Sequence, residues 1–249
     1  MDSEDRGRAV EVFDDLEAMS RAAARLFVAT AKKATEAKGR FTVALAGGGT
    51  PRSTYELLAQ HAFRDQIRWE EVHIFWSDER CVPADDPRSN VGMARLALLD
   101  HVPVPDEQVY PIRWMDDPRK SAADYETVLH TTFGQAPPRF DLILLGVGED
   151  GHTASLFPGT PALAEMESWV VAVMSKDPPR VTLTYPVLNS ASTVAFLVSG
   201  INKADALHKV IDEPDAADPP PAARIHPTDG VLRFFVDNPA ASKLGGIND

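Results

Sequence analysis

Residues 146–152 hold the densest group of potentially reactive side chains in this sequence. They read Gly-Val-Gly-Glu-Asp-Gly-His and directly follow the apolar run 142–145. Glycines let the backbone turn sharply and approach a ligand closely. Because an imidazole titrates near neutral pH, His152 is a candidate general base, although a single histidine is more often structural.

A second glycine-rich turn, Gly-Gly-Gly-Thr-Pro at 47–51, follows the apolar run 41–46. Backbone amides in such a turn, and at the start of the next helix, can bind an anion. We therefore predict a phosphate site; a tight strand-to-helix turn is the alternative. It would consist of Gly47, Gly48, Gly49, Thr50 and Ser53. A nucleoside-triphosphate loop is excluded, because that motif needs a lysine after its last glycine and none follows here.

Charged residues follow two further apolar runs. Asp78-Glu79-Arg80 comes after 72–76, and Lys203 comes after 193–199. One carboxylate could face a ligand and Arg80 could bind a phosphate or a developing oxyanion, but a solvated charged turn is equally compatible. Lys203 and Arg180 are either phosphate ligands or exposed surface cations.

Residues 146–151 also match the Gly-x-Gly-x-x-Gly pattern of dinucleotide-binding proteins. We reject this interpretation because that pattern normally opens the first βαβ unit, and because Glu149 and Asp150 would repel a pyrophosphate. The other histidines show no ligand spacing and no Cys/His metal motif is present, so no metal site is predicted.

The polar clusters share one position relative to the elements that must hold them, since each directly follows an apolar strand. Ligands of open α/β sheets bind beyond the carboxyl ends of the strands, so these clusters should meet at one edge. Strands are predicted at 41–46, 72–76, 109–112, 140–146, 170–174, 180–184, 193–199 and 231–237. Helices are predicted at 14–38, with Asp14 as the cap, and at 51–60, 89–99, 117–132, 203–211 and from 238. This alternation predicts an α/β fold with a mostly parallel sheet covered by helices on both faces.

The remaining segments are predicted to be peripheral. Residues 1–9 are polar and are expected to form a flexible N-terminus, with residues 10–249 forming one domain. Residues 212–222 are rich in acids and prolines and should form a stiff surface loop.

Composition narrows the class of protein. The net charge of −12 argues against binding to nucleic acids or anionic membranes, which require basic surface. The single cysteine, Cys81, allows no internal disulfide and fits a reducing compartment. No apolar run approaches the roughly 18 residues of a membrane span, and the first residues lack the apolar core of a secretory signal. We therefore expect a cytoplasmic protein.

Taken together, the motifs resemble those of the 6-phosphogluconolactonases, which belong with the glucosamine-6-phosphate isomerase/deaminase group. The resemblance rests on Ala-Leu-Ala-Gly-Gly-Gly-Thr-Pro (44–51), Trp-Ser-Asp-Glu-Arg (76–80), Ser-Asn (89–90), Gly-Val-Gly-Glu-Asp-Gly-His-Thr-Ala-Ser-Leu-Phe-Pro (146–158), Arg-Val-Thr-Leu-Thr (180–184) and Ser-Gly-x-x-Lys (199–203). It implies a Rossmann-like three-layer sandwich.

The related deaminases are the closest alternative within this group. Their matching turn carries an acid shortly after the histidine, in a Phe-Asn-Glu-Pro pattern, and that acid helps to open a sugar ring and to move a proton between carbons. Here the matching residues are Ser155-Leu156-Phe157-Pro158, which include no acid. A lactone is already an activated acyl compound, so water and one base can suffice, and the difference favours the lactonase.

The resemblance implies hydrolysis of 6-phospho-D-glucono-1,5-lactone to 6-phosphogluconate, without metal or organic cofactor. Residues 47–49, Thr50, Arg180 and Lys203 would hold the phosphate. His152 would activate water, Arg80 or backbone amides would stabilise the oxyanion, and Asp78 and Asp150 would orient His152 or the sugar hydroxyls. The substrate would be a small sugar-phosphate lactone, with functional coupling to glucose-6-phosphate dehydrogenase. A non-catalytic sugar-phosphate-binding module is the alternative of another class.

Overall fold

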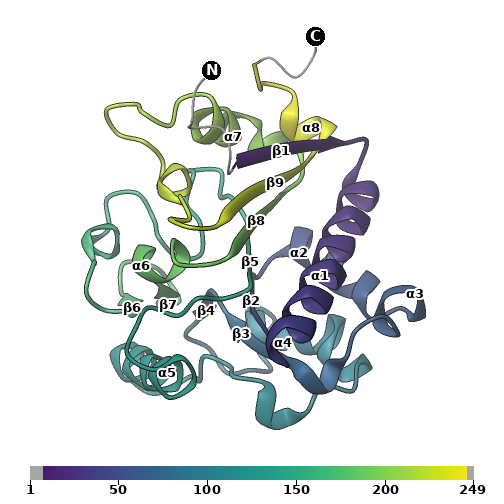
Figure 1. The fold of residues 1–249 in the computed structure, drawn as a ribbon. Helices are drawn as coiled ribbons and strands as arrows, with labels where there is room; N and C mark the ends of the chain where they lie inside the picture. The colour runs from purple at the N-terminus through teal and green to yellow at the C-terminus, as the bar shows by residue number, and fades with distance from the viewer. Residues whose placement is uncertain (1–7, 246–249) are drawn as a thin grey trace.

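A six-stranded parallel sheet forms the centre of the structure (Figure 1). The computed structural model describes residues 8–245. Neighbouring strands follow the order β1-β9-β8-β5-β2-β3, so the chain order reverses between β2 and β5. The strands are β1 (Arg8–Phe13), β2 (Phe41–Leu45), β3 (Val72–Trp76), β5 (Leu142–Leu145), β8 (Thr193–Val198) and β9 (Val231–Asp237).

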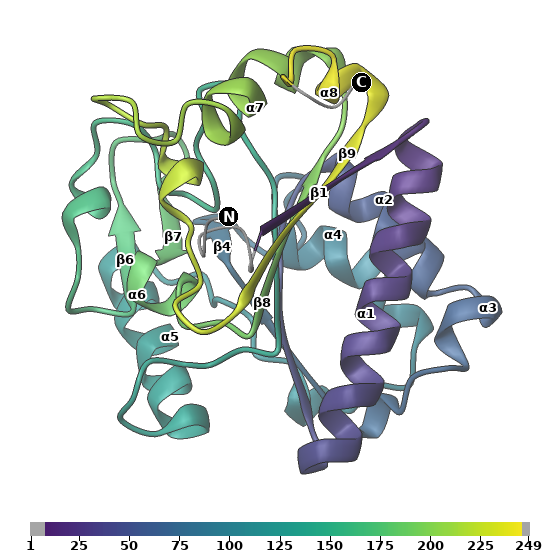
Figure 2. The same cartoon turned by 45° about the horizontal axis from the view of Figure 1, so that its top comes forward.

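Helices cover both faces of this sheet, as Figure 2 shows with the sheet nearly edge-on. On one side lie α1 (Leu16–Lys38), α2 (Gly49–Leu58), α3 (His61–Arg64) and α4 (Asn90–Ala97), and on the other lie α5 (Pro118–Phe133) and α6 (Tyr185–Leu188). The short helices α7 (Ala204–Ile211) and α8 (Asn238–Ala241) follow β8 and β9. This arrangement confirms the predicted three-layer α/β sandwich.

A second sheet of three antiparallel strands lies beside the main one. It consists of β4 (Asp78–Arg80), β7 (Arg180–Leu183) and β6 (Val170–Val173) in the order β4-β7-β6. The predicted strands at 170–174 and 180–184 are therefore confirmed, but they do not join the parallel sheet. No helix separates them, and parallel neighbours need a long crossover connection, so they pair antiparallel.

Three predictions about the elements are corrected by the structure. Arg8 and Ala9, assigned to the flexible N-terminus, belong to β1, which pairs with β9; residues 1–7 lie outside the described part of the chain. The strand predicted at 109–112 is wrong, because only one bridge forms there, between Val109 and Ile74. Pro111 in this segment cannot donate a ladder hydrogen bond. Helix α1 is capped by Asp15, not Asp14.

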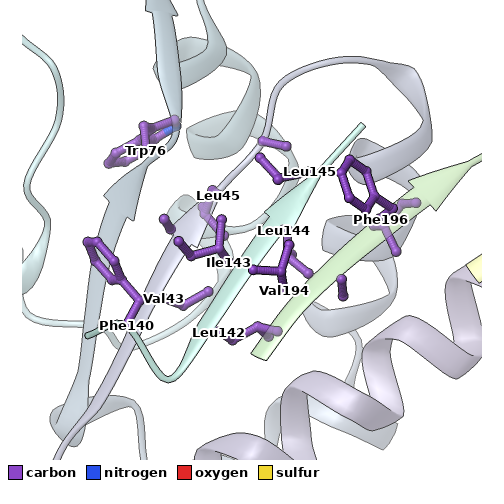
Figure 3. Close-up of a cluster of buried hydrophobic side chains, with 14 of the residues drawn as sticks. Val43, Leu45, Trp76, Phe140, Leu142, Ile143, Leu144, Leu145, Val194 and Phe196 are labelled. Carbon is purple, nitrogen blue, oxygen red and sulfur yellow. The ribbon is translucent and has the colours of Figure 1, made fainter. Parts of the chain in front are cut away.

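The core is centred on β5, whose four residues are fully buried. Figure 3 shows the leucines and isoleucine of β5 between the side chains of β2 and β8. A strand with helices on both faces has no solvent side, which explains its continuous apolar run. Before β5, the carboxylate of Asp141 accepts hydrogen bonds from the Thr42 amide and hydroxyl, at 2.8 and 2.9 Å, and pairs with Lys38 at 2.8 Å. These contacts tie the start of β5 to β2.

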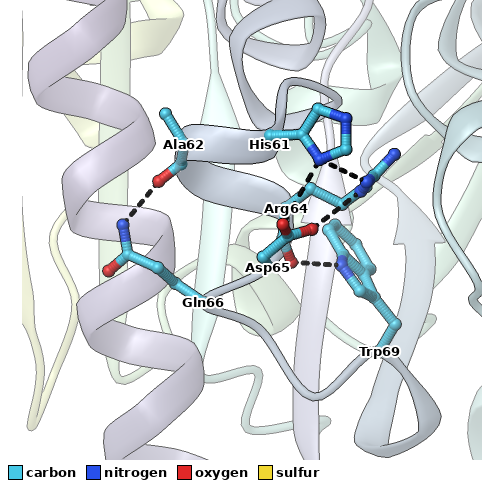
Figure 4. A network of polar contacts seen from close by, with 6 residues as sticks. All are labelled: His61, Ala62, Arg64, Asp65, Gln66 and Trp69. Atoms are coloured by element: carbon cyan, nitrogen blue, oxygen red, sulfur yellow. Dashed lines mark hydrogen bonds and ion pairs between the residues drawn. The ribbon is translucent and has the colours of Figure 1, made fainter.

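Away from the strand ends, a polar network stabilises the connection from α2 to β3 (Figure 4). The Trp69 indole donates to the Arg64 carbonyl at 2.9 Å, and the Arg64 guanidinium donates to Asp65 at 3.0 Å. Hydrogen bonds from Arg64 and His61 lower the pKa of the exposed Asp65 carboxyl. The network orders a surface connection and contributes no residue to the pocket described below.

The burial of β5 gives a direct test of the core. Leu144→Ala should lower the free energy of unfolding by about 2–5 kcal/mol, because it leaves a cavity among fully buried side chains. The control is Leu96→Ala, since Leu96 is 74 % exposed and its loss should change stability by less than about 0.5 kcal/mol. Urea denaturation of both variants measures the difference. Equal midpoints for the two variants would contradict this account of the core.

Candidate active site

The turns that follow β2, β3, β5 and β8 line one pocket of about 280 Å³. These four strands are neighbours in the sheet, and their carboxyl ends lie at the same edge. We refer to residues 47–49 as the glycine turn, 146–152 as the histidine turn and 199–203 as the lysine turn. The predicted convergence of the polar clusters at the strand ends is confirmed, because residues of all three turns and of 77–80 line this pocket.

The glycine turn leads directly into α2, which begins at Gly49. Gly48 has φ +99°, and no side chain caps the helix. The amides of the first helical turn therefore have no side-chain partner and can bind an anion. A Cβ atom on Gly47 would lie 1.8 Å from Asn90 Oδ1, so only glycine fits there.

Two buried tyrosines hold the strand ends that precede these turns. The Tyr55 hydroxyl donates to the Ala46 carbonyl at 2.9 Å and accepts from the Ala46 amide at 3.0 Å. Tyr125 makes the same pair of hydrogen bonds with Trp76, at 3.0 and 2.8 Å. Burial raises the pKa of both tyrosines, so each hydroxyl stays protonated. The hydroxyls satisfy backbone groups at the point where β2 and β3 lead into the pocket.

The neighbouring carboxylates Asp78 and Glu79 point in different directions. Asp78 lines the pocket, whereas Glu79 is buried and accepts hydrogen bonds from the Asn90 and Val91 amides, at 2.7 and 2.8 Å, at the start of α4. Burial raises the pKa of Glu79, and the hydrogen bonds that it accepts oppose this increase. Of the two carboxylates, Asp78, the one that the resemblance implied, is the one that faces the pocket.

Asp78 is held by two side chains that the sequence analysis did not assign to the site. Asn90 Nδ2 donates to the Asp78 backbone carbonyl at 2.9 Å and lies 3.3 Å from Oδ1. The Ser155 hydroxyl donates to Asp78 Oδ2 at 2.6 Å. Asn90 belongs to the Ser-Asn motif (89–90) on which the resemblance rests, but the sequence analysis gave it no role in the site. Ser155 is 77 residues from Asp78 in sequence, so no local signal could connect them.

His152 and Asp150 form a close pair in the histidine turn. His152 Nδ1 lies 2.5 Å from Asp150 Oδ1, and the His152 amide also donates to that oxygen at 3.1 Å. Burial alone would raise the pKa of Asp150, but these hydrogen bonds lower it below its ordinary value. With Nδ1 engaged by Asp150, Nε2 is the ring nitrogen left for a ligand, and His152 lines the pocket while Asp150 stands behind it.

Close packing fixes the position of the imidazole. Its ring lies 4.3 Å, centroid to centroid, from the ring of Phe157, a third residue that the sequence analysis did not assign to the site. On the other side, a Cβ atom on Gly148 would lie 2.0 Å from His152 Nδ1. The glycine at 148 therefore has a steric reason, because the histidine ring occupies the space that a side chain would fill.

Two of the three predicted cations reach the pocket. Arg80 and Lys203 line the pocket. Arg180 is the cross-strand neighbour of Arg80 in the β4–β7 pair; its guanidinium donates to the Pro178 carbonyl and does not line the pocket. Burial, together with the nearby charge of Arg80, lowers the pKa of Arg180. Ser53 faces away as well and donates to the Gly49 carbonyl at 3.4 Å.

The lysine turn is fixed by residues from two other elements. Asp237, at the end of β9, accepts hydrogen bonds from the Ser199 hydroxyl at 2.5 Å and the Gly200 amide at 3.0 Å. Asn202 Nδ2 donates to Glu149 Oε1 at 2.7 Å, which links the lysine turn to the histidine turn. These contacts from β9 and the histidine turn hold the backbone that carries Lys203, which lines the pocket.

Within residues 8–245, no three His, Cys, Asp or Glu side chains gather closely enough to bind a metal ion. In the same part of the chain, no helix has the length and apolar character needed to cross a bilayer.

The contact between Gly47 and Asn90 can be tested by stability. Gly47→Ala should cost about 1–3 kcal/mol of unfolding free energy, since the new methyl group overlaps the Asn90 amide. Gly49→Ala is the matched control, because nothing lies within 4 Å of its Cβ position. It should stabilise the fold by about 0.4–1 kcal/mol through the unfolded chain. Thermal or urea unfolding of both variants measures the effect, and a Gly47→Ala protein as stable as Gly49→Ala would show that Asn90 does not occupy this space.

Comparison with known proteins relates this geometry to a family. The family model described as glucosamine-6-phosphate isomerases/6-phosphogluconolactonase matches residues 14–234. The chain is 41 % identical over 242 residues to 6-phosphogluconolactonase of Nostoc sp., covering 95 % of this chain and 98 % of that protein. It is 43 % identical over 216 residues to 6-phosphogluconolactonase of Synechocystis sp., covering 85 % and 88 %. The solved structure of 6-phosphogluconolactonase from Trypanosoma cruzi superimposes with a TM-score of 0.85 at 30 % identity, covering 96 % and 97 %.

Proposed function

The chain belongs to the glucosamine-6-phosphate isomerase/6-phosphogluconolactonase family, and we propose that it hydrolyses 6-phospho-D-glucono-1,5-lactone to 6-phospho-D-gluconate. The observation that carries this proposal is the His152–Asp150 pair at 2.5 Å, beside a pocket that also holds a turn of unpartnered amides. A base and an anion site in one pocket fit a substrate with a hydrolysable carbonyl at one end and a phosphate at the other.

The chemical step uses His152 as a general base. Nε2 takes a proton from a water molecule as its oxygen attacks the C1 carbonyl of the lactone, while Asp150 holds Nδ1 and stabilises the imidazolium that forms. The oxyanion is stabilised by Arg80 or by backbone amides of the pocket. Collapse of the tetrahedral intermediate breaks the bond between C1 and the ring oxygen. The ring oxygen then receives the proton that His152 took from the water molecule. The product is the open-chain acid.

The other pocket residues bind and orient the substrate. The glycine turn, Thr50 and Lys203 bind the phosphate, since amides at a helix start and a lysine ammonium both favour an anion. Asp78, held by Asn90 and Ser155, accepts hydrogen bonds from sugar hydroxyls. Arg180, the cross-strand neighbour of Arg80, adds positive charge at longer range, and Ser53 supports the start of α2.

The deaminase alternative is disfavoured by one position. In the stretch that matches Phe-Asn-Glu-Pro, Phe157 stands in place of the acid and packs on the His152 ring. Within residues 153–158 only Ala154 lines the pocket, and its methyl group cannot transfer a proton. A non-catalytic binding module is disfavoured because the base, its carboxylate partner and Asp78 are all present. The cytoplasmic location and the functional coupling to glucose-6-phosphate dehydrogenase remain predictions.

Lactone hydrolysis above the spontaneous rate is the test of this function. The lactone is generated in place with glucose-6-phosphate dehydrogenase, and 6-phosphogluconate is followed with its own dehydrogenase, against a no-enzyme control. Glucosamine 6-phosphate is assayed in parallel for ammonia release. We expect a large excess rate on the lactone and none on the amino sugar; the reverse pattern would make the chain a deaminase.

Removing the base should affect turnover and spare binding. His152→Ala should lower kcat by about 10²–10⁴, the usual contribution of a general base. The affinity for 6-phosphogluconate, measured by calorimetry, should change little because the phosphate ligands remain. Near-normal turnover in this variant would remove His152 from the role of base.

Removing the pocket lysine should have the opposite profile. Lys203→Ala should raise KM about tenfold, the loss expected for one charge-assisted contact of roughly 1.4 kcal/mol, and should leave kcat within about threefold. Lys209→Ala is the matched control, because Lys209 is an exposed lysine of α7 that does not line the pocket. Equal KM values for the two variants would place the phosphate elsewhere.

A further inference from the structure

We propose that residues 219–222, here named the proline segment, position the His152–Asp150 pair for catalysis, with Tyr185 as the anchor of that segment. This inference rests on the proposed function. It concerns residues outside the pocket. It assigns a catalytic positioning role to the end of the 212–222 segment, which the sequence analysis treated as a surface loop.

The proline segment contacts the histidine turn at Gly151. The Ala222 amide donates to the Gly151 carbonyl at 3.0 Å. A Cβ atom on Gly151 would lie 2.4 Å from Pro220 Cβ, so the proline ring packs directly on the backbone of this glycine, which has φ +76°. Gly151 stands between Asp150 and His152 in sequence, and any displacement of its peptide groups moves both partners of the 2.5 Å contact.

The segment is stiff enough to hold this position. It contains Pro219, Pro220 and Pro221, and Pro220 adopts φ −61° and ψ 150°, the polyproline II conformation. Prolines restrict the unfolded chain, so ordering them costs less conformational entropy than ordering other residues. Pro221 opens a short 3-10 helix over Pro221–Arg224, and the amides at the start of a helix lack partners within it. The Ala222 amide is one of these, and it points at Gly151.

Tyr185 fixes the proline segment from the opposite side. Its hydroxyl donates to the Pro221 carbonyl at 3.0 Å, and the side chain is buried. Burial raises the pKa of Tyr185 to about 12, so the hydroxyl remains a donor at neutral pH. Tyr185 begins α6 directly after β7, and β7 pairs with β4, which carries Asp78 and Arg80. A continuous set of contacts therefore joins the two sides of the pocket behind the base.

Only the proline end of the 212–222 loop takes part in this contact. Residues 215–218 are exposed, whereas Pro221 and Ala222 are buried. The expected surface position therefore holds for the acidic half of the loop, whereas the proline end is partly buried. The proline segment touches neither the glycine turn nor Lys203 in the contacts described, so loosening it should impair the base and spare phosphate binding.

Two substitutions loosen the proline segment in different ways. Tyr185→Phe removes the anchoring hydroxyl, and Pro220→Gly removes the ring that packs on Gly151. We expect kcat to fall about 3–10-fold in the first and about tenfold or more in the second, because small displacements of a catalytic group are costly. KM should stay within about twofold in both, since it depends on uniform binding of the substrate. The control is Tyr110→Phe, whose hydroxyl contacts His73 outside the pocket, and its kcat should be unchanged.

A double substitution tests the contact itself. Gly151→Ala forces a methyl group against Pro220 and also strains a backbone with φ +76°, so it should lower kcat by about tenfold or more by displacing the base. Adding Pro220→Gly removes the clash and should recover part of this loss, so that the two effects are not additive. Additive losses would overturn the proposal, as would unchanged kcat in both Tyr185→Phe and Pro220→Gly. A rise in KM as large as the fall in kcat would also overturn it, because it would show that loosening the segment does not spare substrate binding.

A spectroscopic measurement separates failure of this inference from failure of the proposed function. The His152 Nδ1 proton shared with Asp150 should give a downfield proton NMR resonance, assigned by its loss in His152→Gln. In Tyr185→Phe it should shift or exchange faster with water, and in Tyr110→Phe it should not. If wild-type protein fails to hydrolyse the lactone, the proposed function fails and this resonance alone decides the inference. An unchanged resonance in Tyr185→Phe and Pro220→Gly would overturn it.

Discussion

The parallel pairing of β5 with β2 and β8 is the constraint on which the rest of the structure depends. Parallel strands carry their carboxyl ends to the same edge, so every turn that follows these strands opens on one side of the sheet. The burial of β5 between two layers of helices stabilises that pairing. The parallel order of the strands therefore sets the position of the pocket, and the side chains and amides of each turn set its chemistry.

The turns divide the work of an acyl-transfer site among short segments. The glycine turn offers amides, the histidine turn offers a base, and the lysine turn offers a cation. Each is held by a group from another element: Asn90 packs against Gly47, Asp237 holds Ser199 and Gly200, and the proline segment packs on Gly151. Such support matters because catalytic groups displaced by about 1 Å lose much of their effect.

The charges of the site contrast with those of the whole molecule. The chain carries a net charge of −12, yet it places Arg80 and Lys203 in a pocket for an anionic substrate. Carboxylates close to the pocket are engaged by other groups: Glu79 caps α4, and Asp78 accepts from Ser155 and lies near the Asn90 amide. Because these hydrogen bonds disperse the negative charge, a local site can accept a phosphate within an acidic protein.

Local patterns in the sequence determined most of the strands, the glycine-rich turns and the position of His152, the proposed base. Apolar runs ending in glycine and charged residues indicate strand ends, and parallel order along the chain brings those ends together. These patterns therefore placed His152, the glycine turn and Lys203 correctly at one pocket. They failed for β1, whose mixed residues become a strand only against β9, and for 109–112, where Pro111 cannot donate a ladder hydrogen bond.

Only the tertiary structure showed why Asp78 faces the pocket while Glu79 does not, and what holds His152. Asp78 and Glu79 are adjacent and chemically alike, but Glu79 is bound at the start of α4, whereas Asp78 is held by Ser155 and Asn90. The partners of the site, Ser155 on Asp78, Phe157 on His152 and Pro220 on Gly151, come from turns and loops without periodic patterns. Side-chain contacts between segments distant in sequence depend on how the layers pack, and no local pattern encodes that packing.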